Sequence, residues 1–402
     1  MKRKRSAWLA LSASCLAVFL PGALIFGFPG VLSPYWQSTF GVGRADVGQV
    51  LFYILAGAGV FMFLIGRLQE RIGSAWVIFL GALIGGAGMV MIAYADGIRW
   101  VYIWGFVNGA SSAFAYLPAL TVVQRWYPAR RGLVTGLVSM SFGIAGAVMA
   151  PVFHLLLQTF DYTSTVLILG IGAAVVGSLV SILIHLPIEG TAKTNGEQPE
   201  MFAGQLSLTL MQSLRTRSFW LLWFTYAFAG AAGISMVTLS VNFGLDRGLG
   251  MPGAVLILAS FNTTNGVGRL VSGFLSDMVG RRQIMGVSFL LAGVSCFLFP
   301  VIGGMAVWMF FAAVIGFSFG TLNAVTAPLV SDCFGMQNFG TIFGLVFTAF
   351  GFVSGAIGPW LSGFLLDATQ GNFALVFIYL GSLLTAATLM IWITSPQTEC
   401  TF

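Results

Sequence analysis

Residues 132–151 have the sequence GLVTGLVSMSFGIAGAVMAP, and residues 340–359 have the sequence GTIFGLVFTAFGFVSGAIGP. Identical residues recur 208 positions apart, and they include Gly132, Gly136, Phe142, Gly143 and Pro151 with their counterparts Gly340, Gly344, Phe350, Gly351 and Pro359. A second pair, GRLQERIGSAW at 66–76 and GFLSDMVGRRQ at 273–283, recurs 207 positions apart. Two similarities with nearly the same separation indicate that the chain is built from two copies of one unit.

The composition places this repeat in a membrane. Of the 402 residues, 58% are hydrophobic and 7% are charged, whereas soluble domains carry about 25% charged residues. Apolar runs long enough to cross a hydrocarbon core of roughly 30 Å as helices recur along the chain. The runs are continuous and do not alternate with polar residues, so helices are expected and a membrane barrel is excluded. The predicted fold class is an all-α membrane protein.

Twelve transmembrane helices in two pseudo-symmetric six-helix bundles are expected. The predicted spans lie near 8–37, 45–66, 74–96, 99–124, 132–158, 161–186, 217–245, 252–276, 283–303, 305–331, 340–366 and 372–394. The longest polar interruption separates the sixth span from the seventh. It predicts an N-terminal bundle at 1–188, a cytoplasmic linker at 189–216 and a C-terminal bundle at 217–402.

The basic residues indicate orientation and not a nucleic-acid partner. The net charge is +6, but an inside N-terminus places 14 of the 18 basic residues in cytoplasmic segments. Only Arg44, Arg99 and Arg247 then face outward. This bias is the positive-inside pattern, and it predicts cytoplasmic termini in a bacterial-type plasma membrane. The first span is too long for a signal peptide, whose apolar region has about 7–15 residues, so we expect an uncleaved helix.

No pattern in the sequence indicates a metal, a cofactor or catalysis. The four cysteines lack the spacing of metal ligands. No His, Cys and Asp cluster and no pair of nucleophile and base is present. We therefore predict no metal, no cofactor, no catalytic residue and no enzyme activity. No protein partner is implied; the expected partners are the lipid bilayer and a small solute.

Arg269 is the charged residue that the membrane setting makes unusual. The stretch from Met251 to Ser276 contains no other charge, and an arginine at mid-helix costs at least about 2.5–3.5 kcal/mol. Its polar neighbours are spaced three and four residues apart, which places them on one helical face; they are Asn262, Asn265, Ser272 and Ser276. This face is expected to line a cavity or another helix. A structural arginine bound by carbonyl groups is the alternative.

An anionic ligand would neutralise this cation. No acidic residue lies deep in any predicted span, and an unpaired buried cation is costly. Guanidinium groups match carboxylates in a bidentate fashion. The predicted substrate is a small organic anion bound by Arg269, with Asn265, Tyr116 and Asn323 supplying orienting hydrogen bonds.

Three stretches resemble the monocarboxylate porter and oxalate/formate antiporter branch of the major facilitator superfamily. They are FGFPG at 26–30, YLPALTVVQRWYPARRGLVTG at 116–136 and NGVGRLVSGFLSDMVGRR at 265–282. Transporters of this superfamily are built from parallel six-helix repeats. The resemblance implies that Arg269 binds a substrate carboxylate and that Tyr116, Phe142 and Phe319 surround it.

The same resemblance assigns a second role to the repeated loops. The short motif after the second and eighth spans implies a conformational latch on the cytoplasmic side, made by Glu70, Arg71, Asp277, Arg281 and Arg282. These residues are expected to hold the halves together without touching the substrate.

Departures from the branch narrow the expected chemistry. The position of a second cation in the oxalate carrier corresponds here to Val346, so one carboxylate is expected and oxalate is not. Gly30 and Asn265 replace a lysine and an aspartate of the animal carriers, which removes the usual proton-handling pair. Asp246 is then the candidate proton acceptor, and a proton is the candidate second partner.

The predicted function is secondary active transport of a lactate-like or pyruvate-like monocarboxylate, by symport or antiport and alternating access. Two alternatives stay open from the sequence. An exporter of larger amphipathic or drug-like compounds would use the same fold, and its substrates would be suited by the 37 Phe and 16 Met residues. A membrane-embedded enzyme or non-transporting sensor is the alternative from another class.

Overall fold

The computed structural model describes residues 2–42, 44–186 and 207–394, and all the regular structure in these ranges is helical. The first half contains α1 (Lys2–Phe26), α2 (Phe28–Phe40), α3 (Arg44–Ile72), α4 (Ser74–Ala93), α5 (Ile98–Trp126), η1 (Pro128–Arg130), α6 (Arg131–Thr159) and α7 (Tyr162–Leu183). The second contains α9 (Leu210–Leu214), α10 (Arg217–Asp246), α11 (Met251–Val279), α12 (Arg281–Leu298), α13 (Met305–Phe334), α14 (Phe339–Thr348), η3 (Ala349–Ser354), η4 (Ala356–Trp360), α15 (Leu361–Ala368) and α16 (Phe373–Ile393). The predicted all-α membrane fold is confirmed.

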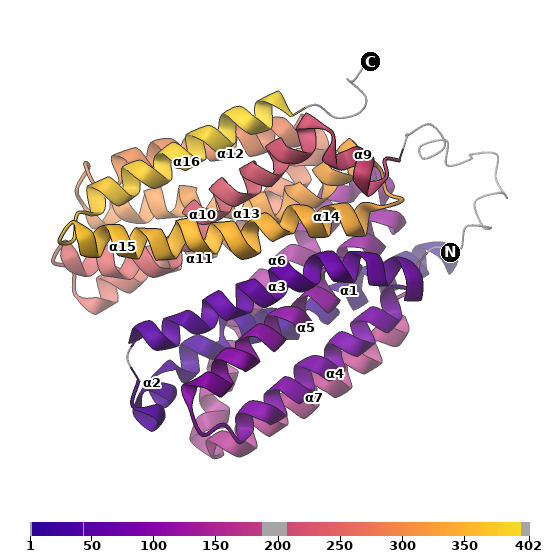
Figure 1. The fold of residues 1–402 in the computed structure, drawn as a ribbon, viewed down its shortest axis with the longest axis horizontal. Helices are drawn as coiled ribbons and strands as arrows, with labels where there is room; N and C mark the ends of the chain where they lie inside the picture. Colours follow the sequence, from indigo (N-terminus) through magenta and orange to yellow (C-terminus); the bar gives the residue numbers. More distant parts are fainter. Residues whose placement is uncertain (1, 43, 187–206, 395–402) are drawn as a thin grey trace.

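The two halves form two bundles that lie side by side (Figure 1). Most of the predicted linker at 189–216 lies outside the described residues, and its described end contains α9. The first residues of α1 and the last residues of α16 lie at the same end of the molecule (Figure 1).

Each of the twelve predicted spans corresponds to helix. By length and composition, nine helices in the described ranges can cross a membrane. The other three predicted spans are α6, α11 and α12. α6 and α11 pack against each other across the two halves, and the middle of α11 carries polar residues that lower its apolarity.

The first predicted span is interrupted, which the sequence prediction missed. Instead of one helix over 8–37, the chain forms α1 and α2 with a turn at Gly27. Pro29 has no N–H to donate to the carbonyl four residues earlier, and its ring clashes there. Gly27 also packs closely on α6, since a Cβ at this position would lie 2.7 Å from the Gly146 carbonyl oxygen.

The eleventh predicted span is continuous but not regular. Its middle consists of the π-helical segments η3 and η4, with Pro359 inside η4. Wider π-type turns are uncommon and occur frequently at functional sites. Phe350 in η3 lines the central cavity described below.

The internal repeat is visible in the packing of each bundle. In the first bundle a Cβ on Gly109 of α5 would collide with the carbonyl of Ile54 in α3. In the second, a Cβ on Gly316 of α13 would collide with the carbonyl of Phe261 in α11. Both members of the second pair lie 207 residues after their counterparts, so the duplicated sequence forms the same helix contact twice.

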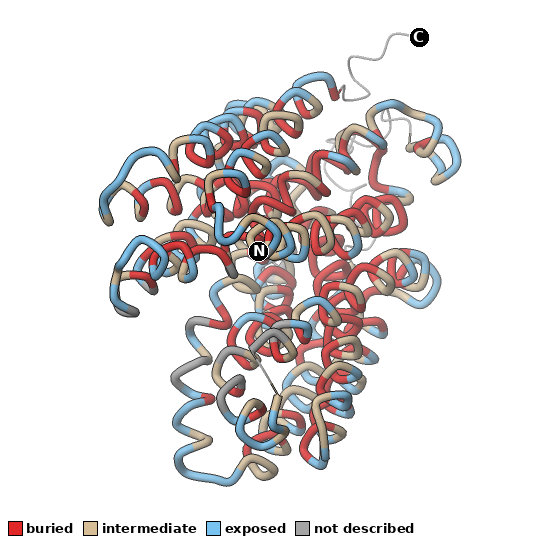
Figure 2. The backbone as a smooth tube through the Cα atoms, turned by 60° about the vertical axis from the view of Figure 1, so that its left-hand side comes forward, coloured by how far each residue is buried: buried red, intermediate tan, exposed pale blue. Residues whose placement is uncertain are grey.

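Large apolar side chains cover the outside of the bundles. Ile182 is 76% exposed and Trp360 is 68% exposed. Buried residues concentrate where the helices meet, while exposed residues follow the outward faces (Figure 2). Water would penalise such a surface, so these faces are suited to lipid.

Candidate functional site

Arg269 lies in α11 where this helix packs against α6 of the other bundle, and 2% of the residue is exposed. Its Nη1 donates to the carbonyl of Ser139 at 3.0 Å and to the Ser139 hydroxyl at 3.1 Å. Its Nε donates to Oδ1 of Asn265 at 3.2 Å. Three of the five N–H groups of Arg269 therefore donate to protein oxygens. The structural role that the sequence left as an alternative, an arginine bound by carbonyl groups, is met in part.

The remaining amino group of Arg269, Nη2, has no described protein acceptor. Within the described residues, no atom accepts a hydrogen bond from Nη2 and no carboxylate forms an ion pair with the guanidinium. The side chain lines an enclosed cavity between the bundles. Because the partners of the cation are neutral oxygens, its positive charge is not cancelled by the protein.

Two glycines of α6 make room for the arginine. A Cβ on Gly136 would lie 2.5 Å from the Arg269 carbonyl oxygen, so the helix backbones are in direct contact there. Two turns later, a Cβ on Gly143 would lie 3.1 Å from Cζ of the guanidinium. The glycines spaced along α6 thus form the surface that packs against the Arg269 backbone and side chain.

The cavity beside Arg269 is small, enclosed and mainly apolar. It offers about 50 Å³ to the centres of water molecules, which is room for a few waters. The first bundle contributes Ile25, Phe26, Ile54, Leu55, Ala58, Met62, Ser112, Tyr116 and Phe142 to its lining. The second bundle contributes Ile234, Arg269, Phe319, Asn323, Phe347 and Phe350.

The repeat explains why these residues meet. Four pairs of lining residues occupy equivalent positions in the halves: Met62 with Arg269, Ser112 with Phe319, Tyr116 with Asn323 and Phe142 with Phe350. Residues near a pseudo-twofold axis come together in this way. The cation is therefore present in one half and replaced by a thioether in the other.

Most of the predicted substrate residues surround this cavity. The Tyr116 hydroxyl lies 3.0 Å from the Ser139 hydroxyl and 3.5 Å from the Asn323 carbonyl oxygen. Asn323 donates from Nδ2 to the Phe319 carbonyl at 2.8 Å.

The aromatic residues predicted around the substrate also lie together. Phe142 packs against Tyr116 with ring centroids 4.9 Å apart, and Phe319 packs against Phe350 at 6.1 Å. Asn265 is not among the residues that line the cavity. Its side chain accepts a hydrogen bond from Nε of Arg269.

The predicted polar stripe of α11 lies mostly against α6. Ser272 and Ser276 are buried and donate to carbonyls of their own helix. A Cβ on Gly132 of α6 would lie 2.5 Å from the Ser276 hydroxyl. Asn262 is exposed, so only the part of the stripe from Arg269 onward is covered by the other bundle.

Asp246 lies apart from the cavity. It is the last residue of α10, its side chain is 47% exposed, and its nearest basic partner is Arg247 at 3.9 Å. The structure therefore does not bring this predicted proton acceptor to Arg269.

The predicted latch contains a carboxylate at a helix N-terminus. Asp277 of α11 accepts hydrogen bonds from the backbone N–H groups of Gly132 and Leu133 in α6, both at 2.9 Å. Arg281 donates to Asp277 at 3.0 Å and also binds Asp332 of α13. A negative charge is stabilised at this end of a helix by the helix dipole, so Asp277 joins the two bundles.

The other latch residues differ in what they contact. Glu70 of α3 accepts a hydrogen bond from the Thr341 hydroxyl in the second bundle at 3.1 Å. Arg282 donates to the Trp392 carbonyl within its own half. Arg71 is exposed and forms no ion pair in the described part of the chain.

Sequence reasoning missed two polar residues that connect the halves. Ser139 holds Arg269 and Tyr116, and Arg131 contacts the Ser331 hydroxyl at 3.2 Å and Asp332 at 3.4 Å. Ser139 lies on the face of α6 that carries Gly136 and Gly143, three and four residues away. That spacing is the sequence signal that could have identified it.

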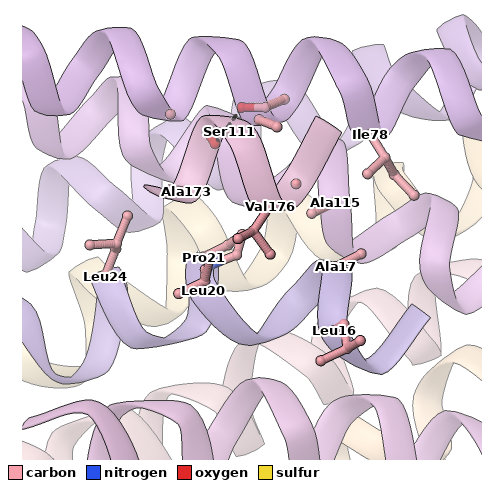
Figure 3. A pocket seen from close by; sticks show the side chains of 14 residues that line it. Leu16, Ala17, Leu20, Pro21, Leu24, Ile78, Ser111, Ala115, Ala173 and Val176 are labelled. Atoms are coloured by element: carbon pink, nitrogen blue, oxygen red, sulfur yellow. Dashed lines mark hydrogen bonds between the residues drawn. The ribbon is translucent and has the colours of Figure 1, made fainter. Parts of the chain in front are cut away.

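A second cavity lies inside the first bundle, between α1, α4, α5 and α7 (Figure 3). Its lining includes Leu16, Leu20, Ile78 and Val176, and no charged residue is found in the described part of this lining. The hydroxyl of Ser111 is already bonded to the Gly81 carbonyl at 2.9 Å. This cavity offers no group to orient a polar ligand, so the Arg269 cavity is the candidate site.

Comparison with known proteins agrees with this geometry. The family model described as Major Facilitator Superfamily matches residues 14–261 and 247–399. Monocarboxylate transporter 11 of Homo sapiens is 28% identical over 340 residues, covering 82% of this chain and 70% of that protein. The oxalate:formate antiporter of Oxalobacter formigenes is 26% identical over 318 residues, covering 75% of this chain and 74% of that protein. The family resemblance stated from the motifs is confirmed.

A solved structure supports the fold independently. The crystal structure of FucP, a major facilitator superfamily transporter in the outward conformation, superposes with a TM-score of 0.71. It covers 98% of this chain and 100% of the FucP chain at 14% sequence identity. At this identity the likeness concerns the arrangement of helices.

Proposed function

The chain belongs to the Major Facilitator Superfamily, and we propose that it is a secondary active transporter of a small monocarboxylate of the lactate or pyruvate type. The carboxylate binds the Nη2 group of Arg269 in the cavity between the bundles. The observation that carries this proposal is an enclosed cation whose amino group lacks a described protein acceptor. A charge-assisted hydrogen bond from a substrate carboxylate would satisfy that group.

The number of charges in the cavity sets the expected class of substrate. Among the described residues of its lining, Arg269 is the only basic one, and the others are apolar or neutral. A second carboxylate would lose its hydration without gaining a cation, which is strongly unfavourable. The proposal therefore favours one carboxylate on a short apolar chain and excludes oxalate.

Alternating access would proceed by movement of the two bundles about this site. The contacts of Asp277 with α6 and of Glu70 with Thr341 close one end of the interface. We assign this end to the cytoplasmic side of a bacterial-type plasma membrane, together with both termini. Asp246 is not given a coupling role, because it lies on the surface beside Arg247.

An exporter of larger amphipathic compounds is the second candidate, and the aromatic lining of the cavity favours it. The small enclosed volume favours the monocarboxylate instead. The enzyme or sensor alternative is set aside, since the family and its structural neighbours are transporters.

The test is uptake of labelled lactate by proteoliposomes containing the purified protein. Arg269→Gln is expected to reduce uptake by about 10- to 100-fold, as expected for the loss of a hydrogen bond to a charged group. Arg247→Gln, at an exposed position outside the cavity, is the matched control and should retain uptake. Equal uptake by wild type and Arg269→Gln would contradict the proposal, as would efficient transport of bulky amphiphiles in place of lactate.

A further inference from the structure

Two polar groups at the central cavity lack hydrogen-bond partners among the described residues, and their chemistry is complementary. The first is Nη2 of Arg269, which carries two N–H donors. The second is Oδ1 of Asn323, an acceptor contributed by α13 of the same bundle. The cavity therefore presents one cationic donor and one neutral acceptor.

The orientation of the Asn323 amide is fixed by its neighbour. The amide contacts the backbone carbonyl of Phe319 at 2.8 Å, and a carbonyl can only accept. The nitrogen must therefore face Phe319, which leaves the amide oxygen as the group without a partner. Flipping the amide would place two oxygens against each other.

A chain of hydrogen bonds connects the two residues that carry these groups, and both residues line the same cavity. Nη1 of Arg269 lies 3.1 Å from the Ser139 hydroxyl, which lies 3.0 Å from the Tyr116 hydroxyl. The Tyr116 hydroxyl in turn lies 3.5 Å from the Asn323 carbonyl oxygen. The rest of the lining is mostly apolar, so an acceptor left without a donor in this enclosed space is costly.

We propose that the transporter selects monocarboxylates that carry a hydrogen-bond donor, with Asn323 as the residue that determines this specificity. The substrate carboxylate binds Arg269, and a substrate hydroxyl donates to Oδ1 of Asn323. In a three-carbon acid of the lactate type, the 2-hydroxyl is the group that provides this donor. This inference rests on the proposed function and narrows it from monocarboxylates in general to hydroxy acids.

Close analogues of lactate differ in this single interaction. Propionate has no donor and leaves the Asn323 oxygen unpaired. Pyruvate places a carbonyl oxygen where a donor is required, so two acceptors face each other. The methyl ether 2-methoxypropionate keeps the oxygen of lactate but has no proton to donate. All three retain the carboxylate that binds Arg269.

The experiment measures the affinity of the purified full-length protein for these four acids by titration calorimetry. Lactate is expected to bind about tenfold more tightly than propionate, pyruvate and 2-methoxypropionate, which corresponds to one net hydrogen bond. Equal or tighter binding of pyruvate or 2-methoxypropionate would overturn the inference. This comparison uses only the wild-type protein, so it does not depend on the folding of any variant.

A substitution then assigns the preference to one residue. Asn323→Leu keeps a similar volume and removes the acceptor, so lactate should bind only as tightly as propionate. The matched control is Thr326→Val on the same helix, where the hydroxyl donates to the Leu322 carbonyl of its own helix. The control should keep the tenfold preference, and a preference that persists in Asn323→Leu would overturn the assignment.

The two proposals fail in different ways. If the acids bind through Arg269 with no preference for lactate, the hydroxyl specificity is wrong while the monocarboxylate function stands. If none of the acids binds and Arg269→Gln leaves uptake unchanged, the monocarboxylate function itself is wrong.

Discussion

Two seams join the halves of this transporter, and the repeat makes each the counterpart of the other. The first seam is α3 against α14 and η3, and the second is α11 against α6. At the closed end they match: a Cβ on Gly344 would meet the Met62 carbonyl, and one on Gly136 would meet the Arg269 carbonyl. These residues occupy equivalent positions in the two halves.

The seams differ two turns further along. In the first, Gly351 meets Gly59 backbone to backbone, with 2.9 Å from a Cβ on Gly59 to the Gly351 Cα. In the second, Gly143 meets the Arg269 guanidinium, and the counterpart of Gly59, Gly266, has open space around its Cβ position. The first seam is therefore packed backbone to backbone at the level where the second seam contains the Arg269 side chain. The duplicated sequence accounts for the contact that the two seams share, and the candidate site lies where the two copies differ.

A substitution that makes the two seams alike should have the largest effect on substrate affinity. Arg269→Met places methionine in the second seam at the position equivalent to Met62 in the first. Substrate affinity should fall by about 100-fold, since hydrogen bonds to charged groups contribute about 1.5–3 kcal/mol. Lactate titration of the purified variant measures this, with Met62→Leu as a control expected to change affinity less than fivefold. Comparable losses in both variants would show that the two positions are not chemically distinct.

Adding a methyl group to each seam tests whether their closed ends are equivalent. Gly136→Ala and Gly344→Ala both place a Cβ against a backbone carbonyl of the other half. Overpacking costs about 1–3 kcal/mol, so each should reduce the population closed at this end by at least about fivefold. Spin-label distances across the seams measure that population.

Gly363→Ala is the control for these two variants, because nothing lies within 4 Å of its Cβ position. An effect of only one of the two substitutions would break the equivalence of the seams.

The acids at the closed end should contribute unequally. Asp277 and Glu70 are counterparts, but Asp277 accepts two backbone N–H groups and binds Arg281, whereas Glu70 accepts one hydroxyl. Asp277→Asn should reduce the closed population by about fivefold to tenfold, since charge at a helix N-terminus contributes up to about 2 kcal/mol. Glu70→Gln should reduce it less than threefold in the same spin-label measurement. The reverse order would contradict this assignment of the latch.

Ser139 is expected to contribute less to substrate affinity than Arg269. Ser139→Ala removes the hydroxyl between Arg269 and Tyr116 but keeps the carbonyl that binds Nη1. Lactate affinity should fall by about fivefold, which corresponds to one neutral hydrogen bond of about 1 kcal/mol. The control is Ser295→Ala, a buried serine bonded only to the Leu291 carbonyl of its own helix. Loss of lactate binding as complete as in Arg269→Met would show that the hydroxyl has a larger role.

The sequence predicted the parts of this arrangement that follow from periodicity. Apolar runs and the 207–208 residue repeat were sufficient for the fold class. Helical spacing of polar residues and the family resemblance also predicted that Arg269, Tyr116 and Asn323 share one site, and all three line the same cavity.

Other contacts of the site and of the helices could not be predicted, because they depend on the main chain and on packing and not on residue type. The Arg269 Nη1 binds a main-chain carbonyl at Ser139, and every residue has such a carbonyl. The interruption at Gly27 lies within a long apolar run. Hydrophobicity predicts one continuous span there and gives no sign of the break beside Pro29. Arg71 and Arg282 belong to the repeated motif, but whether their long side chains reach the other half is decided by packing.

The glycine contacts of the seams have a thermodynamic consequence for motion. Where main chain touches main chain, no rotamers are frozen when the surfaces meet and none are released when they part. Ordering a long side chain costs up to about 2 kcal/mol, so an interface of bare backbone avoids this entropy change in each transport cycle. If the halves alternate as proposed, these glycine contacts re-form without ordering any side chain, whereas the contacts of Asp277 and Arg269 must be broken and remade.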